Sequence, residues 1–291
     1  MSDILRGIFP VVYNPFNVAG EIDEEDLRKL VDHLIACGAH GLLADGGASE
    51  CHWLTTEERK NNVAVIIDQA KGRVPVIAGV SAQDTKTALE LAYYAENTGA
   101  SAILSTPPSA GKPDADIIHS HYQALAQAVN VPIIVHTLNV PIAMAQLYDL
   151  IREFPNITHI KEETPEVAGH AISEILRLSD GKVQVFSGSM HLLDELARGA
   201  VGAIPGSICV ADQVRAYQLF TSGDHKGARQ AHNHVVPLIF ARNQAYLAWG
   251  KEILRRQGIF KTAYVREPSQ IMDEYDQMEL TAIMDSVGPP F

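Results

Sequence analysis

Short apolar runs recur along the chain, and segments with a helical pattern separate them. The runs are dense in valine and isoleucine and do not alternate with polar residues, which is typical of parallel strands buried on both faces. Eight such runs occur, at residues 7–13, 40–45, 74–80, 101–106, 131–136, 157–161, 183–188 and 201–206. They predict eight parallel strands.

The segments between the runs carry signals for the start and end of helices. Asp23 is placed to cap a segment whose apolar residues share one face, and Gly38 follows that segment. Thr55 and Glu58 form a capping-box pattern, and Gly99 ends the next helical segment. Strand and helix alternating eight times predict a (β/α)₈ TIM barrel. The competing open, doubly wound sheet needs a glycine-rich phosphate loop after its first strand, and the sequence lacks one.

From about residue 210 the pattern becomes entirely helical. The three or more helices predicted there exceed what a barrel needs. We therefore expect a barrel region over residues 1–225 and a C-terminal helical extension over residues 226–291. The extension would pack on the barrel or on a partner subunit.

Composition narrows the classes of partner. The 291 residues carry a formal net charge of −12, which argues against a nucleic-acid or anionic-membrane partner. Cys37, Cys51 and Cys209 form no disulfide framework and no metal-binding spacing, so a reducing cytoplasm is expected. No segment approaches the ~18 apolar residues that a membrane span needs. The histidine pairs at 119 and 121 and at 232 and 234 are spaced to point apart, so no metal site is predicted.

Reactive groups in a barrel gather at the C-terminal ends of the strands. Lys161 follows an apolar strand and precedes two glutamates. A buried lysine is costly unless it is paired or neutral, and a neutral amine attacks carbonyl groups. The alternative is a rim lysine paired with Glu162.

Four other strand ends carry candidate groups. The turn at residues 46–50 reads GGASE, and its backbone N–H groups could hold a carboxylate or a phosphate. The alternative is a tight turn that leads to the cap at Thr55. His136 ends the fifth run and could serve as an acid or base, or simply as a structural residue. Residues 187–189 and 205–207 lie where many barrels bind phosphate.

Several motifs follow one another along the chain, densest over residues 7–210: GIFPVVYNPF, GGASE followed by LTTEER, GRVPVIAGV, STPP, HIKEET, VFSG and GAIPGS. In their order and spacing, these motifs resemble the dihydrodipicolinate synthase and N-acetylneuraminate lyase family of class I aldolases. The resemblance implies a homo-oligomer, a dimer or tetramer, in which Lys161 forms an imine with pyruvate or a related 2-oxo acid and no separate cofactor is needed. The substrate-binding residues that it implies are Gly47, Ala48, Ser49, Glu50, Ser187, Gly188 and Ile204.

The chain also departs from the family pattern. The family's Gly-Thr-Thr-Gly-Glu loop reads Gly-Gly-Ala-Ser-Glu here, so both threonine hydroxyls are missing. The tyrosine that usually shuttles the proton reads His136, and the tyrosine after strand four is absent. The arginine that the synthase carries after strand five has no counterpart in TLNVPIAM. We therefore expect that the chain is not a true dihydrodipicolinate synthase and that His136 replaces the tyrosine.

Three functions remain open at this point. The first is a Schiff-base lyase, an aldolase or dehydratase, acting on a 2-oxo acid. The second is a non-catalytic member that binds a 2-oxo acid, and the third is a phosphate-sugar barrel enzyme of another lineage. Few fixed cations and several rings (Tyr13, His52, Trp53 and His136) are expected at the barrel mouth, so an apolar or hydroxylated substrate tail is predicted.

Overall fold

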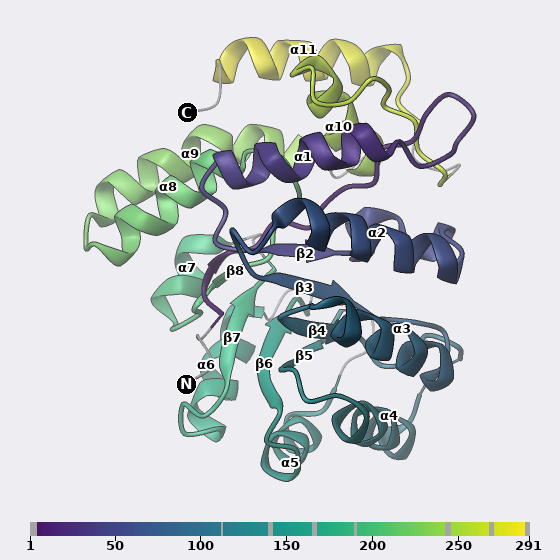
Figure 1. The fold of residues 1–291 in the computed structure, drawn as a ribbon. Helices are drawn as coiled ribbons and strands as arrows, with labels where there is room; N and C mark the ends of the chain where they lie inside the picture. The colour runs from purple at the N-terminus through teal and green to yellow at the C-terminus, as the bar shows by residue number, and fades with distance from the viewer. Residues whose placement is uncertain are drawn as a thin grey trace.

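A closed ring of eight short parallel strands forms the centre of the molecule (Figure 1). The structure is a computed structural model and describes residues 5–111, 113–138, 142–164, 168–188, 191–241, 246–267 and 271–288. The strands are β1 (Gly7–Ile8), β2 (Leu42–Ala44), β3 (Val76–Gly79), β4 (Ala102–Ser105), β5 (Ile133–His136), β6 (Ile157–Glu162), β7 (Gln184–Ser187) and β8 (Gly202–Ala203). Each lies within one of the predicted runs or extends it by one residue, so the prediction of eight parallel strands is confirmed.

The ring closes between β1 and β2. The other neighbours follow the order β1-β8-β7-β6-β5-β4-β3-β2, all parallel. Val11 and Leu43 form a parallel bridge across the gap, and the amide of Leu43 donates to the carbonyl of Pro10 at 2.9 Å. Beyond Ile8 the hydrogen bonds to the β8 side continue, from the amide of Phe9 to the carbonyl of Ala203 at 2.9 Å and from the amide of Val11 to the carbonyl of Pro205 at 2.7 Å. The TIM barrel predicted from the sequence is therefore confirmed.

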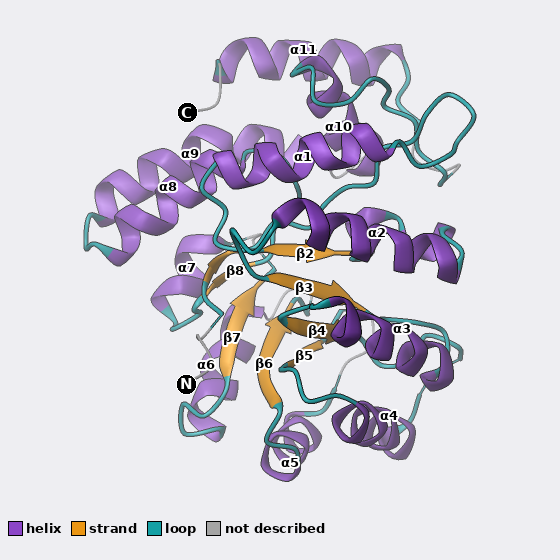
Figure 2. Cartoon of the chain, in the orientation of Figure 1, coloured by secondary structure: helices purple, strands orange, loops and turns teal. Residues whose placement is uncertain are grey.

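Helices surround the strands, as Figure 2 shows. They are α1 (Glu24–Ala36), α2 (Thr56–Ala70), α3 (Thr85–Thr98), α4 (Ala115–Ala128), α5 (Met144–Glu153), α6 (Ala168–Leu178), α7 (Leu192–Ala197) and α8 (Val210–Thr221). Asp23 caps α1, and Thr55 and Glu58 form the predicted capping box of α2. Gly99 caps the C-terminus of α3 in the left-handed conformation.

Side chains fill the interior of the barrel beneath the strand ends. His159 and Lys161 are two residues apart on β6 and therefore point to the same side. His159 stacks on Phe186, and the ring of Phe9 meets Phe186 edge to face at 5.3 Å. The barrel is consequently a packed core, and Lys161 lies above it.

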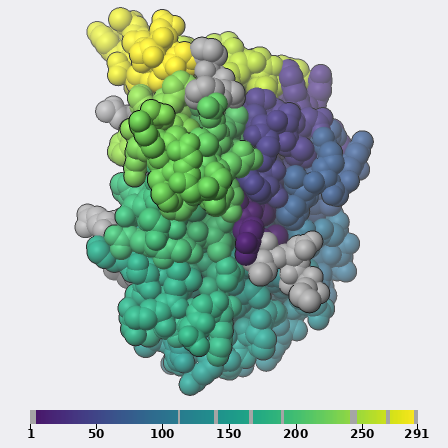
Figure 3. All heavy atoms as spheres, turned by 90° about the vertical axis from the view of Figure 1, so that its left-hand side faces the viewer, coloured from purple at the N-terminus to yellow at the C-terminus, as the bar shows by residue number. Residues whose placement is uncertain are grey.

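Three more helices form the C-terminal extension: α9 (His225–Ala241), α10 (Tyr246–Arg256) and α11 (Glu274–Val287). α9 packs against α8, and α11 packs against α9. The extension occupies one end of the molecule, where Figure 3 draws it in light green and yellow. α9 begins beside the predicted boundary, although the division into two domains stays a prediction. Every helix in the described ranges is too short or too polar to cross a membrane.

Candidate active site

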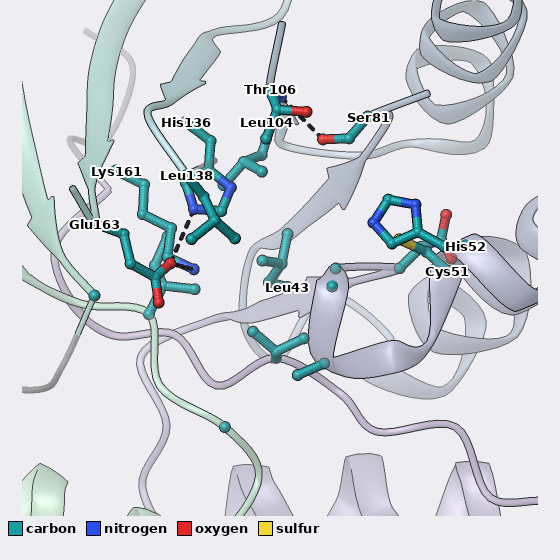
Figure 4. A pocket seen from close by; sticks show the side chains of 18 of the residues that line it. Leu43, Cys51, His52, Ser81, Leu104, Thr106, His136, Leu138, Lys161 and Glu163 are labelled. Atoms are coloured by element: carbon teal, nitrogen blue, oxygen red, sulfur yellow. Dashed lines mark hydrogen bonds and ion pairs between the residues drawn. The ribbon is translucent and has the colours of Figure 1, made fainter. Parts of the chain in front are cut away.

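A cavity of about 380 Å³ opens at the C-terminal ends of the strands. Its wall combines polar groups from the ends of several strands with apolar side chains, as Figure 4 shows. The described residues that the next paragraphs use from this wall are Asp45, Gly47, Ala48, His52, Ser81, Thr106, Ser109, His136, Lys161, Glu163, Gly188 and Ile204. Such a volume fits a small organic acid with a short tail.

Three charged or titratable side chains meet on one side of the cavity. Oε2 of Glu163 lies 2.9 Å from Nζ of Lys161 and 2.9 Å from Nε2 of His136. Lys161 and His136 are register partners at the ends of β6 and β5, and Glu163 follows β6 directly. The two predicted catalytic residues are thus together, and a third group that the sequence analysis did not assign joins them (Figure 4).

Burial sets the charge states in this cluster. It lowers the pKa of His136 to about 4, and the charge of Lys161 acts in the same direction, so the imidazole is neutral at pH 7. Burial alone would raise the pKa of Glu163. Lys161 and the hydrogen bond with His136 outweigh that effect and hold the pKa of Glu163 at about 2. An ionised carboxylate and a neutral imidazole that donates from Nε2 therefore flank Lys161.

Glu162 faces a different set of partners. Its carboxylate accepts from the hydroxyl of Thr137 at 3.0 Å and from the amide of Thr164 at 2.8 Å. Lys161 is buried and pairs with Glu163. The alternative of a rim lysine paired with Glu162 is therefore wrong.

The turn at residues 46–50 contributes backbone to the cavity. Gly47 and Ala48 line it, and they open a 3₁₀ helix, η1 (Gly47–Ser49), where no preceding turn supplies acceptors for their amides. Ser49 lies behind the turn: its hydroxyl donates to the carbonyl of Val12 at 2.6 Å and accepts from the amide of Gly46 at 3.1 Å.

Glu50 also lies outside the described lining of the cavity. Its side chain is fully buried and pairs with Lys251 of α10. Ser49 and Glu50 were both expected to bind substrate, and their side chains instead anchor the turn from behind.

At the ends of the last two strands, some of the expected residues likewise line the cavity and others make contacts outside it. Gly188 and Ile204 line the cavity as expected, whereas the hydroxyl of Ser187 is outside the lining and donates to the buried carboxylate of Glu195. Ser207 uses its hydroxyl to donate to the carbonyl of Val11 at 2.5 Å. Ser189 lies outside the described residues. The two described serines therefore give no support to a phosphate site after strands seven and eight.

Polar residues also line the cavity away from the Lys161 cluster, and among them the buried carboxylate of Asp45 is paired with Arg59. Ser81, Thr106 and Ser109 contribute hydroxyl groups, and His52 lies at the exposed rim. The backbone amide of Thr106 donates to the hydroxyl of Ser81 at 2.9 Å (Figure 4). This bond fixes the hydroxyl of Ser81 relative to the backbone of Thr106. Lys161 is the only lysine or arginine among the described lining residues.

Two rings that were expected at the mouth lie elsewhere. Tyr13 is completely buried with its ring against Gly250 of α10, and Trp53 is half exposed outside the described lining. Both follow strand ends, and sequence position alone did not reveal which way each ring points.

The described residues include no group of three or more His, Cys, Asp or Glu side chains placed to hold a metal ion. The histidines at the predicted i, i+2 spacing separate as expected. His119 pairs with Glu153 on the surface, and His121 bonds to Thr85 and Ser105 inside the protein.

Glu163 was missed because its role depends on geometry at the very end of a strand. It is two residues from Lys161, which is the spacing that returns side chains to one face of an extended chain. That spacing was available in the sequence and could have identified the pair. The register between β5 and β6, which brings in His136, was not.

The chain is similar to known proteins over most of its length. The chain matches the sequence profile of the dihydrodipicolinate synthetase family over residues 4–287. It is 32% identical to a 4-hydroxy-tetrahydrodipicolinate synthase from Bartonella bacilliformis, over 81% of this chain and 82% of the relative. It is 33% identical to the same enzyme from Methanopyrus kandleri, over 80% of each chain.

Solved structures agree on the architecture. A crystal structure of a dihydrodipicolinate synthase superposes with a TM-score of 0.91 at 29% identity, covering 98% of this chain and 99% of the other. YagE, a prophage protein of the same family from E. coli K12 solved in complex with pyruvate, superposes with a TM-score of 0.92 at 24% identity and shares the fold over 98% of this chain and 99% of its own. The chain therefore belongs to the dihydrodipicolinate synthase family of Schiff-base-forming lyases of the class I aldolase type.

Proposed function

We propose that this protein is a lyase, an aldolase or dehydratase, that holds pyruvate or a related 2-oxo acid as an imine on Lys161. One observation carries the proposal. A single carboxylate oxygen of Glu163 lies 2.9 Å from the nitrogen of Lys161 and 2.9 Å from a nitrogen of His136, inside a cavity at the strand ends. A nucleophile with a base beside it, and a third group that orients the base, is an arrangement suited to covalent catalysis.

The covalent step needs the neutral amine. Glu163 is ionised and within hydrogen-bonding distance, so it can take a proton from Lys161 as the amine attacks the 2-oxo carbon. The same carboxyl group can then return the proton to the departing hydroxyl, and water leaves as the imine forms. The protonated imine withdraws electrons from the neighbouring carbon–carbon bonds, which is the basis of both lyase reactions.

Glu163 and His136 are placed for the proton transfers that follow. In a retro-aldol reaction, the base removes the proton of the C4 hydroxyl as the C3–C4 bond breaks, leaving an enamine of pyruvate. In a dehydration, the base removes a proton from C3, and the C4 hydroxyl leaves as water after protonation. His136 acts as the neutral hydrogen-bond donor that orients Glu163 in either case.

The substrate carboxylate would bind at the 46–50 turn. The amides of Gly47 and Ala48 open η1 at the cavity wall and supply donors in place of the family's threonine hydroxyls. Gly188 and Ile204 would complete the pocket around the 2-oxo acid.

The rest of the cavity favours a neutral, hydroxylated tail. The hydroxylated residues Ser81, Thr106 and Ser109 line the cavity, and no arginine is among the described lining residues. A second carboxylate on the substrate would lose its hydration there without gaining a cationic partner. This supports a monocarboxylic 2-oxo acid and an activity that differs from 4-hydroxy-tetrahydrodipicolinate synthesis.

The competing hypothesis is a non-catalytic binding protein. The pairing of Lys161 with an ionised Glu163 favours catalysis, because a binding site for an acid gains nothing from a carboxylate beside the only lysine among its described lining residues.

A substrate screen tests the function. Monocarboxylic 2-oxo acids with hydroxylated tails are supplied, and released pyruvate and lost water are measured by separate assays. Turnover that disappears in Lys161→Ala supports the lyase, and its two products distinguish aldolase from dehydratase. Efficient formation of 4-hydroxy-tetrahydrodipicolinate would contradict the proposed substrate class, and turnover that survives in Lys161→Ala would contradict the mechanism.

We further propose that the protein is a cytoplasmic homodimer or homotetramer. Ile271, Tyr275 and Met278 expose large apolar side chains on or beside α11, which supports contact with another subunit. Cys37, Cys51 and Cys209 form no disulfide with one another, in keeping with a reducing compartment. Sedimentation velocity that finds only monomer at micromolar concentration would contradict the assembly.

A further inference from the structure

We infer that Glu50 and Lys251 are positioning residues, whose buried ion pair makes the C-terminal extension hold the substrate-carboxylate turn in place. The inference rests on the proposed function, because that function assigns the carboxylate to the amides of Gly47 and Ala48. It goes beyond that function because it gives a role to α10 and to residues 262–267, which belong to the C-terminal extension and not to the strand that carries Lys161.

The lysine of the pair is completely enclosed. The side chain of Lys251 is 0% exposed, and its ammonium donates to Oε1 of Glu50 and, at 3.0 Å, to the carbonyl of Tyr264. It also lies 4.2 Å from the centre of the Phe16 ring. Burial lowers the pKa of Lys251 to about 8 although Glu50 opposes that shift.

The carboxylate of the pair collects donors from the extension. Oε2 of Glu50 accepts from the amide of Arg266 at 2.7 Å and from the amide of Glu267 at 3.2 Å. With Lys251 on the other oxygen, both carboxylate oxygens are bound by residues more than 190 positions away in the sequence. The side chain that follows η1 is therefore fixed entirely by the C-terminal extension.

Arg266 adds a second link to the same region. Its guanidinium bonds to Glu58 of the α2 capping box at 2.6 Å and to the carbonyl of Trp53 at 3.1 Å. The guanidinium also lies 4.5 Å from the centre of the Phe16 ring. The chain from Glu50, which follows η1, to Glu58 in the first turn of α2 is thus held at both ends by residues of the extension.

Besides Glu50, the turn is held by the hydroxyl of Ser49 and by the side-chain amide of Asn14, which donates to the carbonyl of Ser49 at 2.6 Å. Glu50 adopts a left-handed backbone conformation, with φ of 58°, which is unfavourable for a residue other than glycine unless its surroundings impose it. A Cβ added to Gly47 would meet no atom within 4 Å, so the cavity side of the turn has room to move. The anchors at Ser49 and Glu50 therefore decide where the two amides point.

A purely structural role predicts a different outcome from a positioning role. Removing one charge leaves the other buried and unpaired, which destabilises the protein, whereas removing both charges relieves that cost. Stability should therefore recover in the double variant Glu50→Gln with Lys251→Met. Positioning should not recover, because the neutral pair lacks the ammonium that fixes Oε1.

The test uses pyruvate as the probe and borohydride to trap the imine on the full-length protein. The rate of adduct formation on Lys161, measured by mass spectrometry against pyruvate concentration, gives a half-saturation concentration and a maximal rate. Thermal unfolding is measured for the same proteins: wild type, Glu50→Gln, Lys251→Met, Lys251→Arg and the double variant. Lys60→Met is the control, because it removes an ammonium paired with Glu57 and Glu90 on the barrel surface.

We expect the half-saturation concentration to rise about tenfold in Lys251→Met and in the double variant, while the maximal rate changes less than threefold. Lys251→Arg should recover part of the loss, and Lys60→Met should match the wild type. A double variant of wild-type stability and wild-type half-saturation would overturn the inference.

Hydrogen exchange separates this inference from the proposed function. If wild-type protein forms no adduct with pyruvate, the proposed function fails, and the coupling is tested by exchange alone. Amides 46–50 should then exchange at least tenfold faster in the double variant while amides of β5 and β6 keep their rates. Unchanged exchange at the turn would overturn the coupling.

Discussion

Nζ of Lys161 and Oε2 of Glu163 lie 2.9 Å apart at the end of β6, two residues from each other in the sequence. His136 reaches the same oxygen from β5. In the proposed mechanism, the proton relay expected of His136 alone passes through this carboxylate. Glu163 would then act as the base beside Lys161 in place of the family's tyrosine.

Glu163→Gln is predicted to separate imine formation from turnover. The amide keeps the shape and can still accept a hydrogen bond, but it cannot take a proton, so kcat should fall about 10²- to 10⁴-fold. Trapping of pyruvate on Lys161 should persist at a reduced rate. Steady-state kinetics and borohydride trapping measure the two effects, with the surface variant Glu174→Gln as the control. Wild-type kcat in Glu163→Gln would contradict the role of Glu163.

The pH profile should report a neutral His136. Because burial holds the pKa of His136 at about 4, kcat/KM should show no loss caused by its protonation between pH 8 and about pH 5. His136→Gln, which retains an N–H donor, should be more active than His136→Phe. An acid limb near pH 6.5 that disappears in both variants would show that the imidazole is charged in the working enzyme.

Most of the architecture was predictable because it depends on local patterns. Unbroken apolar runs gave all eight strands, and the caps at Asp23 and at Thr55 with Glu58 lie where the sequence places them. Strand ends were less predictable. β1 is limited to Gly7–Ile8, although single hydrogen bonds to the β8 side continue as far as Val11.

The candidate site was only half predictable. Lys161 and His136 follow from strand-end positions, but the orientation of Ser49, Glu50 and Ser187 depends on partners far away in the chain or on a neighbouring helix. The link between Glu50 and Lys251 spans 201 residues, and nothing local to either residue announces it. Long-range contacts of this kind appear only when the barrel is closed and the extension is in place.

Stability is predicted to fall as the pH decreases from about 6.5 towards 4. Burial lowers the pKa of His121, His136 and His159 to about 4 in the folded protein, below the usual 6.5, so the unfolded chain binds more protons in this window. Their contribution is complete above pH 6.5 and is lost at about 1.4 kcal/mol per pH unit for each histidine. Thermal unfolding at pH 7, 6 and 5 checks this. Equal midpoints at pH 7 and pH 5 would contradict it.

Gly202→Ala should weaken the closure of the barrel. An added Cβ would lie 1.9 Å from the carbonyl oxygen of Gly7, which is backbone of the paired strand and cannot move without breaking the β1–β8 ladder. We expect a loss of about 3 kcal/mol or more in the free energy of unfolding. Gly47→Ala is the steric control for stability, with open space around the new methyl group. Equal urea midpoints for the two variants would argue against this packing.

Trapping of an imine on Lys161 tests the central claim most directly. The protein is incubated with pyruvate and borohydride, digested, and analysed by mass spectrometry, with Lys161→Ala and Lys182→Ala treated in parallel. The account predicts a reduced pyruvate adduct on the peptide that contains Lys161, present in Lys182→Ala and absent in Lys161→Ala. A wild-type protein that gains no adduct from pyruvate or from a panel of related 2-oxo acids, or that carries it on another lysine, would contradict the account.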